Sequence, residues 1–245
     1  KGEMACGEYG EGKMSSPKQI FSFLDNYFNK KNIIKKRSLK ALVTAGPTRE
    51  FIDPIRYISN ESSGKQGYEI ADALNRLGIE TTLITGPSSI VSNKDIKTKK
   101  IVTASEMFEA VKESLPVDIA VCAAAVADLK PVYKSKSKLK KDNLRLKSFE
   151  LQKNIDILEF LGKNNKHRPK IVIGFAAETE NLDKNALSKL KQKNCDIIIA
   201  NDISKKDSGF NSDYNRVSII DNSGKIKVVK KNKKSFIANI IADII

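Results

Sequence analysis

The chain has 245 residues, 40% of them hydrophobic, which is enough for a sizeable core without disulfide bonds. Lysine and arginine number 44 against 29 aspartate and glutamate residues, so the formal net charge is +15, and this charge favours an anionic partner. The three cysteines, Cys6, Cys122 and Cys195, lie far apart, so they form neither a CxxC motif nor a disulfide framework. No segment reaches the ~18 apolar residues of a membrane span, and we expect a cytoplasmic protein.

The first predicted element is an amphipathic helix over residues 17–28. Its apolar residues recur at helical spacing: Ile20, Phe21, Leu24, Tyr27 and Phe28. The apolar face of this helix is therefore expected to pack against another element. Residues 29–37 follow as a basic linker.

From Ser38 onward, strand patterns alternate with helix patterns. The predicted strands are 39–45, 81–85, 100–102, 117–123, 171–176 and 196–201, and the predicted helices are 67–77, 104–115 and 182–193. Thr103 and Glu106 have the spacing of a capping box at the start of the second helix. Repeated βα units of this kind predict an α/β fold: a Rossmann-like, mostly parallel sheet with helices on both faces.

A long loop separates the first strand from the first helix, and it is rich in Gly, Pro, Ser and Asn. About 22 residues there show no period of their own, and connections of that length are usually functional or disordered. Ser62, Ser63 and Gly64 lead into the helix, where hydroxyl groups and free backbone N–H groups would converge on an anion, best matched by phosphate. The loop is not a Walker motif, since Gln66 follows Lys65, and it lacks the dinucleotide fingerprint. The alternative is a structural Ω-loop, which its basic and amide residues disfavour.

Three later motifs lie at the carboxyl ends of predicted strands: AAAVAD at 123–128, GFAAET at 174–179 and ANDIS at 200–204. Ligands of open parallel sheets bind beyond the carboxyl ends of the strands. We therefore expect the glycine-rich loop and these three motifs to line one crevice.

Residues 129–150 interrupt the βα rhythm with a strongly basic insertion. Eight basic residues lie within it: Lys130, Lys134, Lys136, Lys138, Lys140, Lys141, Arg145 and Lys147. It is either a solvated charged loop or a mobile basic flap beside a phosphate site, and alternation over 144–147 favours a β-ribbon. At the C-terminus, segments 216–220 and 225–229 flank a turn and predict a hairpin, followed by an amphipathic helix from Phe236 to Ile244.

The residues of these motifs, and their order, resemble those of a known family. GPTRE at 46–50, DPIRYISN at 53–60, SSGKQG at 62–67, KLKK at 138–141, KNID at 153–156 and GFNSD at 209–213, together with the three strand-end motifs, occur in the order and spacing of phosphopantothenate-cysteine ligase. The chain resembles that family, the synthetase half of bifunctional coenzyme A biosynthesis proteins, over residues 38–245.

The N-terminal stretch resembles a different family. ACGEYGEGKMSSP, residues 5–17, is similar to the substrate clamp at the end of phosphopantothenoylcysteine decarboxylase, and Cys6 matches the clamp cysteine, which is a catalytic acid there. Without the flavin-binding body, Cys6 is expected to be an inactive remnant. We therefore divide the chain into a decarboxylase remnant and linker, 1–37, and a ligase domain, 38–245.

The ligase resemblance implies a reaction. The carboxylate of 4′-phosphopantothenate is activated with CTP as an acyl-cytidylate, and cysteine then displaces CMP to form an amide, the second step of coenzyme A biosynthesis from pantothenate. The resemblance further implies Mg²⁺ or Mn²⁺, no FMN in this chain, a homodimer natively fused to a flavin-dependent decarboxylase, and neither nucleic acid nor membrane as a partner. The residues do not distinguish CTP from ATP.

Nucleotidyl transfer depends mainly on positioning and charge stabilisation, which suits a chain rich in Lys and Asn with a single histidine. That histidine, His167, is expected in a surface loop, and one histidine makes a Ser-His-Asp or His-rich metal mechanism hard to build.

The resemblance also implies site residues. Asn60, Arg56 and Lys138 match catalytic positions. The nucleotide-binding positions are Gly46, Ser62, Ser63, Gly64, Lys65, Cys122, Ala123, Ala124, Asp128, Ile155, Asp156, Ile157, Leu158, Phe175, Lys189 and Lys193. One motif departs from the family, because Ile155 stands where KNPD has proline, which leaves the conformation of that turn open.

Two other classes stay as alternatives. A short-chain-type NAD(P) reductase shares the expected sheet, but its Tyr-x-x-x-Lys pair occurs only as Tyr9/Lys13 and Tyr27/Lys31, before the first strand. A nucleic-acid-binding module is supported by charge alone, and the chain has neither zinc spacing nor Trp for stacking.

Overall fold

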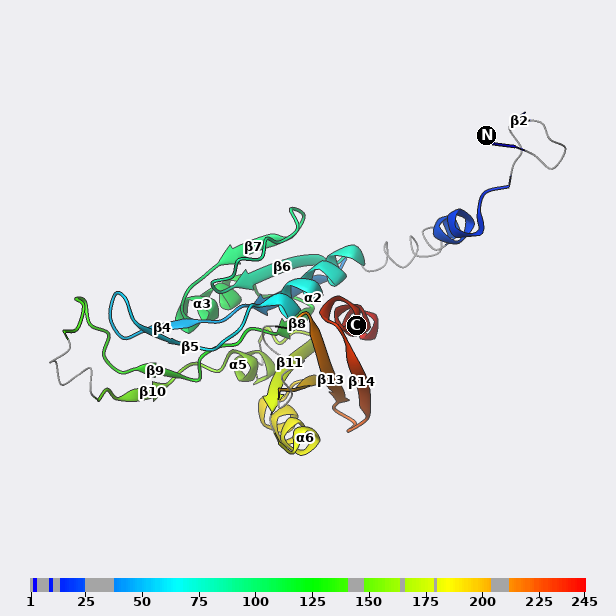
Figure 1. Ribbon diagram of the computed structural model, residues 1–245. Helices are drawn as coiled ribbons and strands as arrows, with labels where there is room; N and C mark the ends of the chain where they lie inside the picture. Colours follow the sequence, from blue (N-terminus) through cyan, green and yellow to red (C-terminus); the bar gives the residue numbers. More distant parts are fainter. Residues whose placement is uncertain are drawn as a thin grey trace.

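Eight strands form one mixed sheet that organises residues 38–245 (Figure 1). The computed structural model describes residues 2–3, 9–10, 14–24, 38–140, 148–163, 166–178, 180–203 and 212–245. The strands of the sheet are β3 (Lys40–Ala45), β6 (Glu80–Thr85), β7 (Lys97–Lys100), β8 (Ile119–Cys122), β11 (Ile171–Glu178), β12 (Ile197–Asp202), β13 (Tyr214–Asp221) and β14 (Ile226–Lys233). Their order is β14-β13-β12-β11-β8-β3-β6-β7.

The strands from β7 to β12 in this order run parallel, and β13 and β14 add an antiparallel hairpin at one edge. The five helices described beside the sheet are α2 (Lys65–Arg76), α3 (Ala104–Ser114), α5 (Ile157–Lys163), α6 (Leu182–Lys193) and α7 (Lys234–Ile244). The prediction of a mostly parallel sheet with helices on both faces, closed by a C-terminal hairpin and helix, is confirmed.

Each face of the sheet has its own apolar core. On one face, Ile70 of α2 and Ile237 of α7 are fully buried against the strands. On the other face, Met107 of α3, Leu161 of α5 and Leu190 of α6 form the second cluster. Burial of each such side chain contributes ~2 kcal/mol. Because both faces are covered, the ends of the strands are the part of the sheet left open to a ligand.

Most predicted boundaries agree with the structure, and the predicted capping box is present: Thr103 Oγ1 accepts from Glu106 N (3.2 Å). The strand predicted at 100–102 was placed wrongly, since β7 is Lys97–Lys100. This edge strand reads KTKK and has no apolar run to mark it. The sequence also did not indicate α5, whose seven residues are too few to establish a helical period.

The long loop after β3 contains a hairpin that its sequence did not predict. β4 (Arg49–Phe51) pairs with β5 (Tyr57–Ser59), and both project to one side of the sheet (left in Figure 1). Each strand has only three residues, which is too short for an alternating pattern to be read from the sequence.

A buried carboxylate, Asp53, fixes the turn of this hairpin. Its Oδ1 accepts from the backbone N–H groups of Ile55 and Arg56 (2.8 Å each), and its Oδ2 accepts from Arg56 Nη1 (2.8 Å) and Leu139 N (3.2 Å). Burial alone would raise the pKa of Asp53, but these N–H donors and the guanidinium outweigh it, so the pKa lies below its ordinary value. Asp53 thus joins the hairpin to the segment that carries Lys138.

A two-stranded ribbon brackets the basic insertion. β9 (Leu129–Pro131) pairs with β10 (Leu151–Lys153). Residues 141–147 lie outside the described residues, so the ribbon expected over 144–147 stays a prediction.

At the N-terminus, β1 (Gly2–Glu3) pairs with β2 (Tyr9–Gly10), and residues 17–24 are helical, in agreement with the start of the helix predicted over 17–28. Cys6 and the linker predicted at 29–37 lie outside the described residues. No helix in the described ranges is long and apolar enough to cross a membrane.

Candidate functional site

A cavity of about 1020 Å³ lies at the carboxyl ends of β3, β8, β11 and β12. Residues of all four predicted motifs line it: Ser62 and Gly64 of the loop, the AAAVAD segment, Phe175 of GFAAET and Asn201 of ANDIS. The expectation that these motifs meet in one crevice is confirmed, at the position where open α/β sheets bind ligands.

One end of the cavity is the start of α2. Gly46 and Gly64 both have positive φ (74° and 78°), and a Cβ on Gly64 would lie 2.7 Å from the backbone N of Gly46. Glycine at both positions therefore lets the helix begin directly against the end of β3. At this helix start, Gly64 N donates to Ser62 Oγ (3.2 Å) and Lys65 N donates to Ser63 Oγ (3.4 Å). The positive end of the helix dipole lies beside Ser62 and Lys65, which both line the cavity.

Asn60 joins the loop to the AAAVAD segment. Its Nδ2 donates to the carbonyl oxygens of Ala125 (3.2 Å) and Val126 (3.0 Å), and the residue lines the cavity. Thr48 strengthens the same junction, since its Oγ1 accepts from Ala127 N (3.0 Å). The carboxamide is therefore held in place before any ligand arrives.

The opposite end of the cavity is formed by α5 and α6. Lys189 Nζ donates to the carbonyl of Phe175 (3.1 Å), and Lys193 Nζ contacts Asp156 (2.9 Å) and Glu159 (2.8 Å). The i, i+4 spacing correctly places both lysines at one corner, but in this structure protein carboxylates balance the charge of Lys193. Hydrogen bonds from Lys163 and Lys193 lower the pKa of Glu159 to about 2, and the bond to Glu159 raises the pKa of Lys193.

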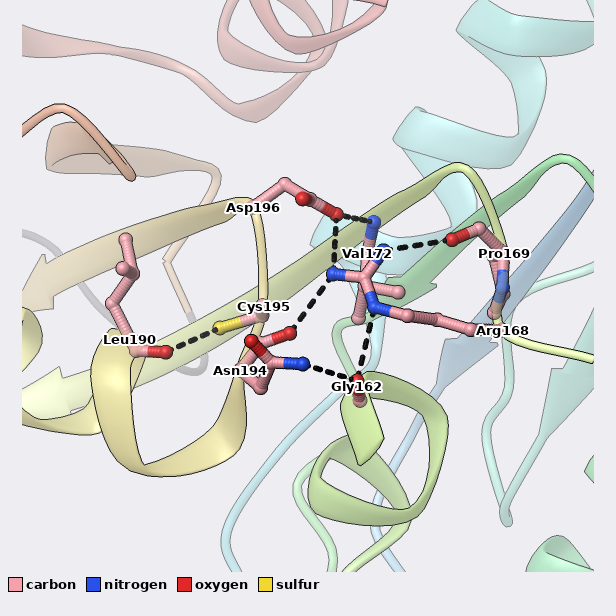
Figure 2. A network of polar contacts seen from close by, with 8 residues as sticks. All are labelled: Gly162, Arg168, Pro169, Val172, Leu190, Asn194, Cys195 and Asp196. Atoms are coloured by element: carbon pink, nitrogen blue, oxygen red, sulfur yellow. Dashed lines mark hydrogen bonds and ion pairs between the residues drawn. The ribbon is translucent and has the colours of Figure 1, made fainter. Parts of the chain in front are cut away.

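Figure 2 shows how this corner is held together. Arg168 donates to the carbonyl oxygens of Gly162 (2.9 Å), Pro169 (3.0 Å) and Asn194 (2.9 Å) and to the carboxylate of Asp196 (3.0 Å). The last turn of α5 also lies against the last turn of α6, because a Cβ on Gly162 would lie 2.0 Å from the carbonyl oxygen of Lys193. Arg168 and Gly162 thus fix the two helices that supply this wall.

The wall between the two ends is neutral. Burial raises the pKa of the Cys122 thiol to about 12, so this cavity-lining residue stays protonated at physiological pH. Ala123 and Ala124 continue the same small, uncharged surface, and Ala124 N donates to Thr44 Oγ1 (3.3 Å). The surface can pack against a ligand but offers no nucleophile.

The structure does not bring every predicted residue to the cavity. Arg56 pairs with Asp53 and also donates to Leu139 O (3.2 Å), and Lys138 is exposed; neither lines the cavity. Gly46 lies against the backbone of Gly86, and Ser63 O accepts from Ser88 Oγ (2.8 Å); neither residue lines the cavity. His167 is exposed, as predicted.

All the other predicted nucleotide-binding residues line the cavity: Ser62, Gly64, Lys65, Cys122, Ala123, Ala124, Asp128, Ile155, Asp156, Ile157, Leu158, Phe175, Lys189 and Lys193. The turn in which Ile155 replaces the family's proline is held by Asn154, whose N donates to Asp128 O (2.8 Å) and whose Nδ2 donates to Ala127 O (3.0 Å).

Several polar lining residues were not among the predicted site residues: Thr44, Gln66, Lys153, Asn154, Glu159, Asn201, Asn215 and Lys234. Asn154 belongs to the KNID motif, so that motif could have indicated it. Among the described residues, no group of three or more His, Cys, Asp or Glu side chains is placed to hold a metal ion.

Comparisons with protein families and with individual proteins agree with one another. The family described as DNA/pantothenate metabolism flavoprotein C-terminal domain matches residues 36–245. The coenzyme A biosynthesis bifunctional protein CoaBC of Haemophilus influenzae is 41% identical over 245 residues, covering 100% of this chain and 60% of that protein. The protein of the same name from Escherichia coli is 40% identical over 248 residues, covering 99% and 59%.

Among solved structures, the C-terminal domain of a CoaBC protein superposes with a TM-score of 0.70 at 35% identity, covering 84% of this chain and 92% of that one. The chain spans about 60% of the length of the Haemophilus influenzae and Escherichia coli proteins.

Proposed function

The chain belongs to the DNA/pantothenate metabolism flavoprotein C-terminal domain family, and on that premise we propose that it is a ligase of coenzyme A biosynthesis. It joins 4′-phosphopantothenate to cysteine and uses CTP to activate the carboxylate. The relatives are named as bifunctional proteins, so the proposal extends to a natural fusion with a second enzyme domain, a flavin-dependent decarboxylase. A homodimer is proposed from the family resemblance alone.

The observation that carries the proposal is the layout of the cavity. The start of α2 lies at one end, two lysines of α6 lie at the other, and a neutral wall from Cys122 to Ala124 lies between them. Its volume of about 1020 Å³ is at the upper end of the usual range for small-molecule sites, ~300–1,000 Å³. A cavity of this size accommodates a nucleotide together with a phosphorylated acid.

In the first half-reaction, a carboxylate oxygen of the acid attacks the α-phosphorus of CTP, and the bond to pyrophosphate breaks. In the second, the cysteine amine attacks the acyl carbon, the bond to CMP breaks, and the amine loses a proton. Both steps need donors and positive charge around oxygens that gain negative charge. The positive end of the α2 dipole fits the first step, and Asn60, whose Nδ2 donates to the carbonyl oxygens of Ala125 and Val126, holds the loop at that end of the cavity.

A divalent cation, Mg²⁺ or Mn²⁺, would neutralise the phosphate charge. Mg²⁺ in nucleotide sites is usually held by the phosphates, water and one or two protein carboxylates. The exposed carboxylate of Asp128 at the cavity fits that role, and a cluster of three protein ligands is not required.

Lys138 is proposed to act from a flap. Its neighbour Leu139 is buried and hydrogen-bonded through both backbone groups to the Asp53–Arg56 pair, while Lys138 itself is exposed. The base of the flap is therefore fixed, and the lysine reaches the triphosphate when the segment closes. In this arrangement Arg56 positions the flap.

The direct test is CTP-dependent release of pyrophosphate with 4′-phosphopantothenate, followed by formation of an amide when cysteine is added. ATP in place of CTP measures nucleotide preference, and NADPH and duplex DNA test the reductase and nucleic-acid alternatives. Release that needs both CTP and the phosphorylated acid supports the ligase. Tight binding of NADPH or DNA without pyrophosphate release would contradict it.

A further inference from the structure

Asp53 ties the turn of the β4–β5 hairpin to a segment 86 positions further along the chain. Its side chain is 0% exposed, and Oδ2 accepts from Leu139 N (3.2 Å) and from Arg56 Nη1 (2.8 Å). Arg56 Nη1 also donates to Leu139 O (3.2 Å). Both backbone groups of Leu139 are therefore bound to one ion pair, whose carboxylate is buried.

The same two segments meet at a second place. Ser135 N donates to Ile52 O (2.9 Å), and Lys134 Nζ lies 4.9 Å from the centre of the Phe51 ring. Within residues 131–140, every fourth residue is buried and the others are exposed. The buried residues are Pro131, Ser135 and Leu139. The segment is therefore anchored to the hairpin through Ser135 and Leu139, and its lysines occupy exposed positions between and beside these anchors.

Lys138 directly precedes the second anchor. Four lysines lie within residues 134–140, and their mutual repulsion favours a spread segment unless specific bonds hold it in place. The hairpin also leads back to the cavity, because β5 ends at Ser59, next to the cavity-lining residue Asn60. Asp53 thus lies on a continuous structural path from Asn60 to Lys138.

We propose that Asp53 is a positioning residue of the ligase, which sets where Lys138 lies relative to the cavity through its bond to Leu139 N. The inference rests on the proposed function, in which Lys138 meets the triphosphate. Asp53 does not line the cavity, so it acts through its neighbours rather than on the substrate. A carboxylate suits this task, since its two oxygens accept bonds from the turn, from the guanidinium and from Leu139 at the same time.

A purely structural role for Asp53 predicts a different outcome. If the carboxylate only stabilised the hairpin, its loss would affect the protein equally whether or not Lys138 is present. If it positions Lys138, its loss should matter only while that lysine is there. A double-mutant cycle between the two residues separates these roles.

The experiment compares Asp53→Asn in the wild-type and Lys138→Ala backgrounds. Asparagine keeps the shape but has one acceptor oxygen and no charge. At saturating CTP, Asp53→Asn should slow pyrophosphate release by ~10-fold or more in the wild type, because a displaced group loses its alignment with the reacting atoms. In the Lys138→Ala background the further loss should be less than ~2-fold. The affinity for CTP, measured by calorimetry, should change by less than ~2-fold.

Asp118→Asn is the matched control. Asp118 Oδ2 accepts from Lys40 N (2.9 Å) and its Oδ1 pairs with Lys170 (2.9 Å), at the start of β3 and far from the carboxyl ends of the strands. This variant should release pyrophosphate at the wild-type rate. A folded Asp53→Asn protein that releases pyrophosphate at the wild-type rate or faster, or that loses the same factor in both backgrounds, would overturn the proposal. If Asp53→Asn does not fold, Leu139→Pro removes the same bond from the other side and carries the same expectations.

If the wild type releases no pyrophosphate from CTP with the phosphorylated acid, the proposed function fails. Trypsin digestion followed by mass spectrometry then tests the anchoring alone, through the rates of cleavage after Lys136 and Lys138. Asp53→Asn should be cut there ~5-fold faster than the wild type, because local opening exposes the peptide bonds, and Asp118→Asn should be cut at the wild-type rate. Faster cleavage in Asp53→Asn alone supports a role for Asp53 in holding Lys138, and equal rates in all three proteins reject it.

Discussion

Replacing Arg168 by methionine removes the side chain that joins the end of α5 to the loop between α6 and β12 (Figure 2). The guanidinium donates to three backbone carbonyl oxygens and one carboxylate at 2.9–3.0 Å. Methionine retains the apolar stem, so the substitution tests the hydrogen bonds rather than the packing.

The expected loss in the free energy of unfolding depends on which hydrogen bonds each acceptor keeps without Arg168. Gly162 O keeps a bond from Asn194 Nδ2 (2.8 Å), and Asp196 Oδ2 keeps the bond from Val172 N (2.7 Å). The carbonyls of Pro169 and Asn194 lose a charged donor. Because the Arg168 side chain is 27% exposed, water replaces part of the loss. We expect the free energy of unfolding to fall by ~2–3 kcal/mol.

The same substitution should also weaken ligand binding in the cavity. Lys193 lies at the end of α6 and against Gly162, so loosening of this junction displaces the lysine wall of the cavity. We expect CTP affinity to fall by ~5-fold, which corresponds to about 1 kcal/mol.

Urea denaturation and calorimetry measure the two effects. Lys170→Met is the matched control: its ion pair with Asp118 (2.9 Å) involves a lysine side chain that is 77% exposed, so the loss should stay within ~0.5 kcal/mol. Arg168→Lys should be intermediate, since an ammonium cannot reproduce the planar fork. If Arg168→Met is as stable as Lys170→Met, the network has no role in holding the corner.

Four further predictions concern the site and its surroundings. Asn60→Asp places a carboxylate opposite the carbonyls of Ala125 and Val126 and removes a donor, so turnover should fall by ~10²-fold while CTP binding persists; wild-type turnover would show the loop assignment to be wrong. Lys138→Ala should slow pyrophosphate release by ~10²-fold or more and alter aminolysis of a supplied acyl-cytidylate less; equal effects on both would place the lysine elsewhere. Removal of residues 1–37 should leave ligation intact, and a folded but inactive truncation would refute the proposed domain boundary. The pKa of Glu159 is lowered from 4.5 to about 2 by Lys163 and Lys193, so its contribution to stability is complete above about pH 4.5 and is lost as the pH falls towards 2; Glu159→Gln should flatten the urea midpoint over that range, and an unchanged profile would contradict the pairing.

Much of the fold was predictable because its signals are local. Buried parallel strands such as β3 and β12 are continuous apolar runs, and the capping box of Thr103 and Glu106 marks a helix start within four residues. The β4–β5 hairpin was not predictable in this way. Its turn depends on Asp53, whose partner Leu139 lies 86 positions along the chain.

The site residues likewise divide into those marked by local sequence motifs and those placed by contacts far apart in the chain. Motifs that follow strands meet in the cavity because parallel strands end at one edge, so Ser62, Cys122 and Phe175 were placed correctly. Lys234 was not indicated, since the bond from Gln66 that holds its backbone spans 168 positions. One lysine among many has no local signal until the fold buries it.

The two outermost strands of the sheet, β7 and β14, read KTKK and IKVVKKNK. An open sheet ends in unpaired backbone N–H and C=O groups, which can recruit strands from other molecules, and lysine along an edge strand opposes that association by charge repulsion and hydration. Part of the excess that gives the chain its net charge of +15 therefore lies where copies of the protein would otherwise add strand to strand. The same basic residues that suggested an anionic partner also protect the sheet against intermolecular β-aggregation.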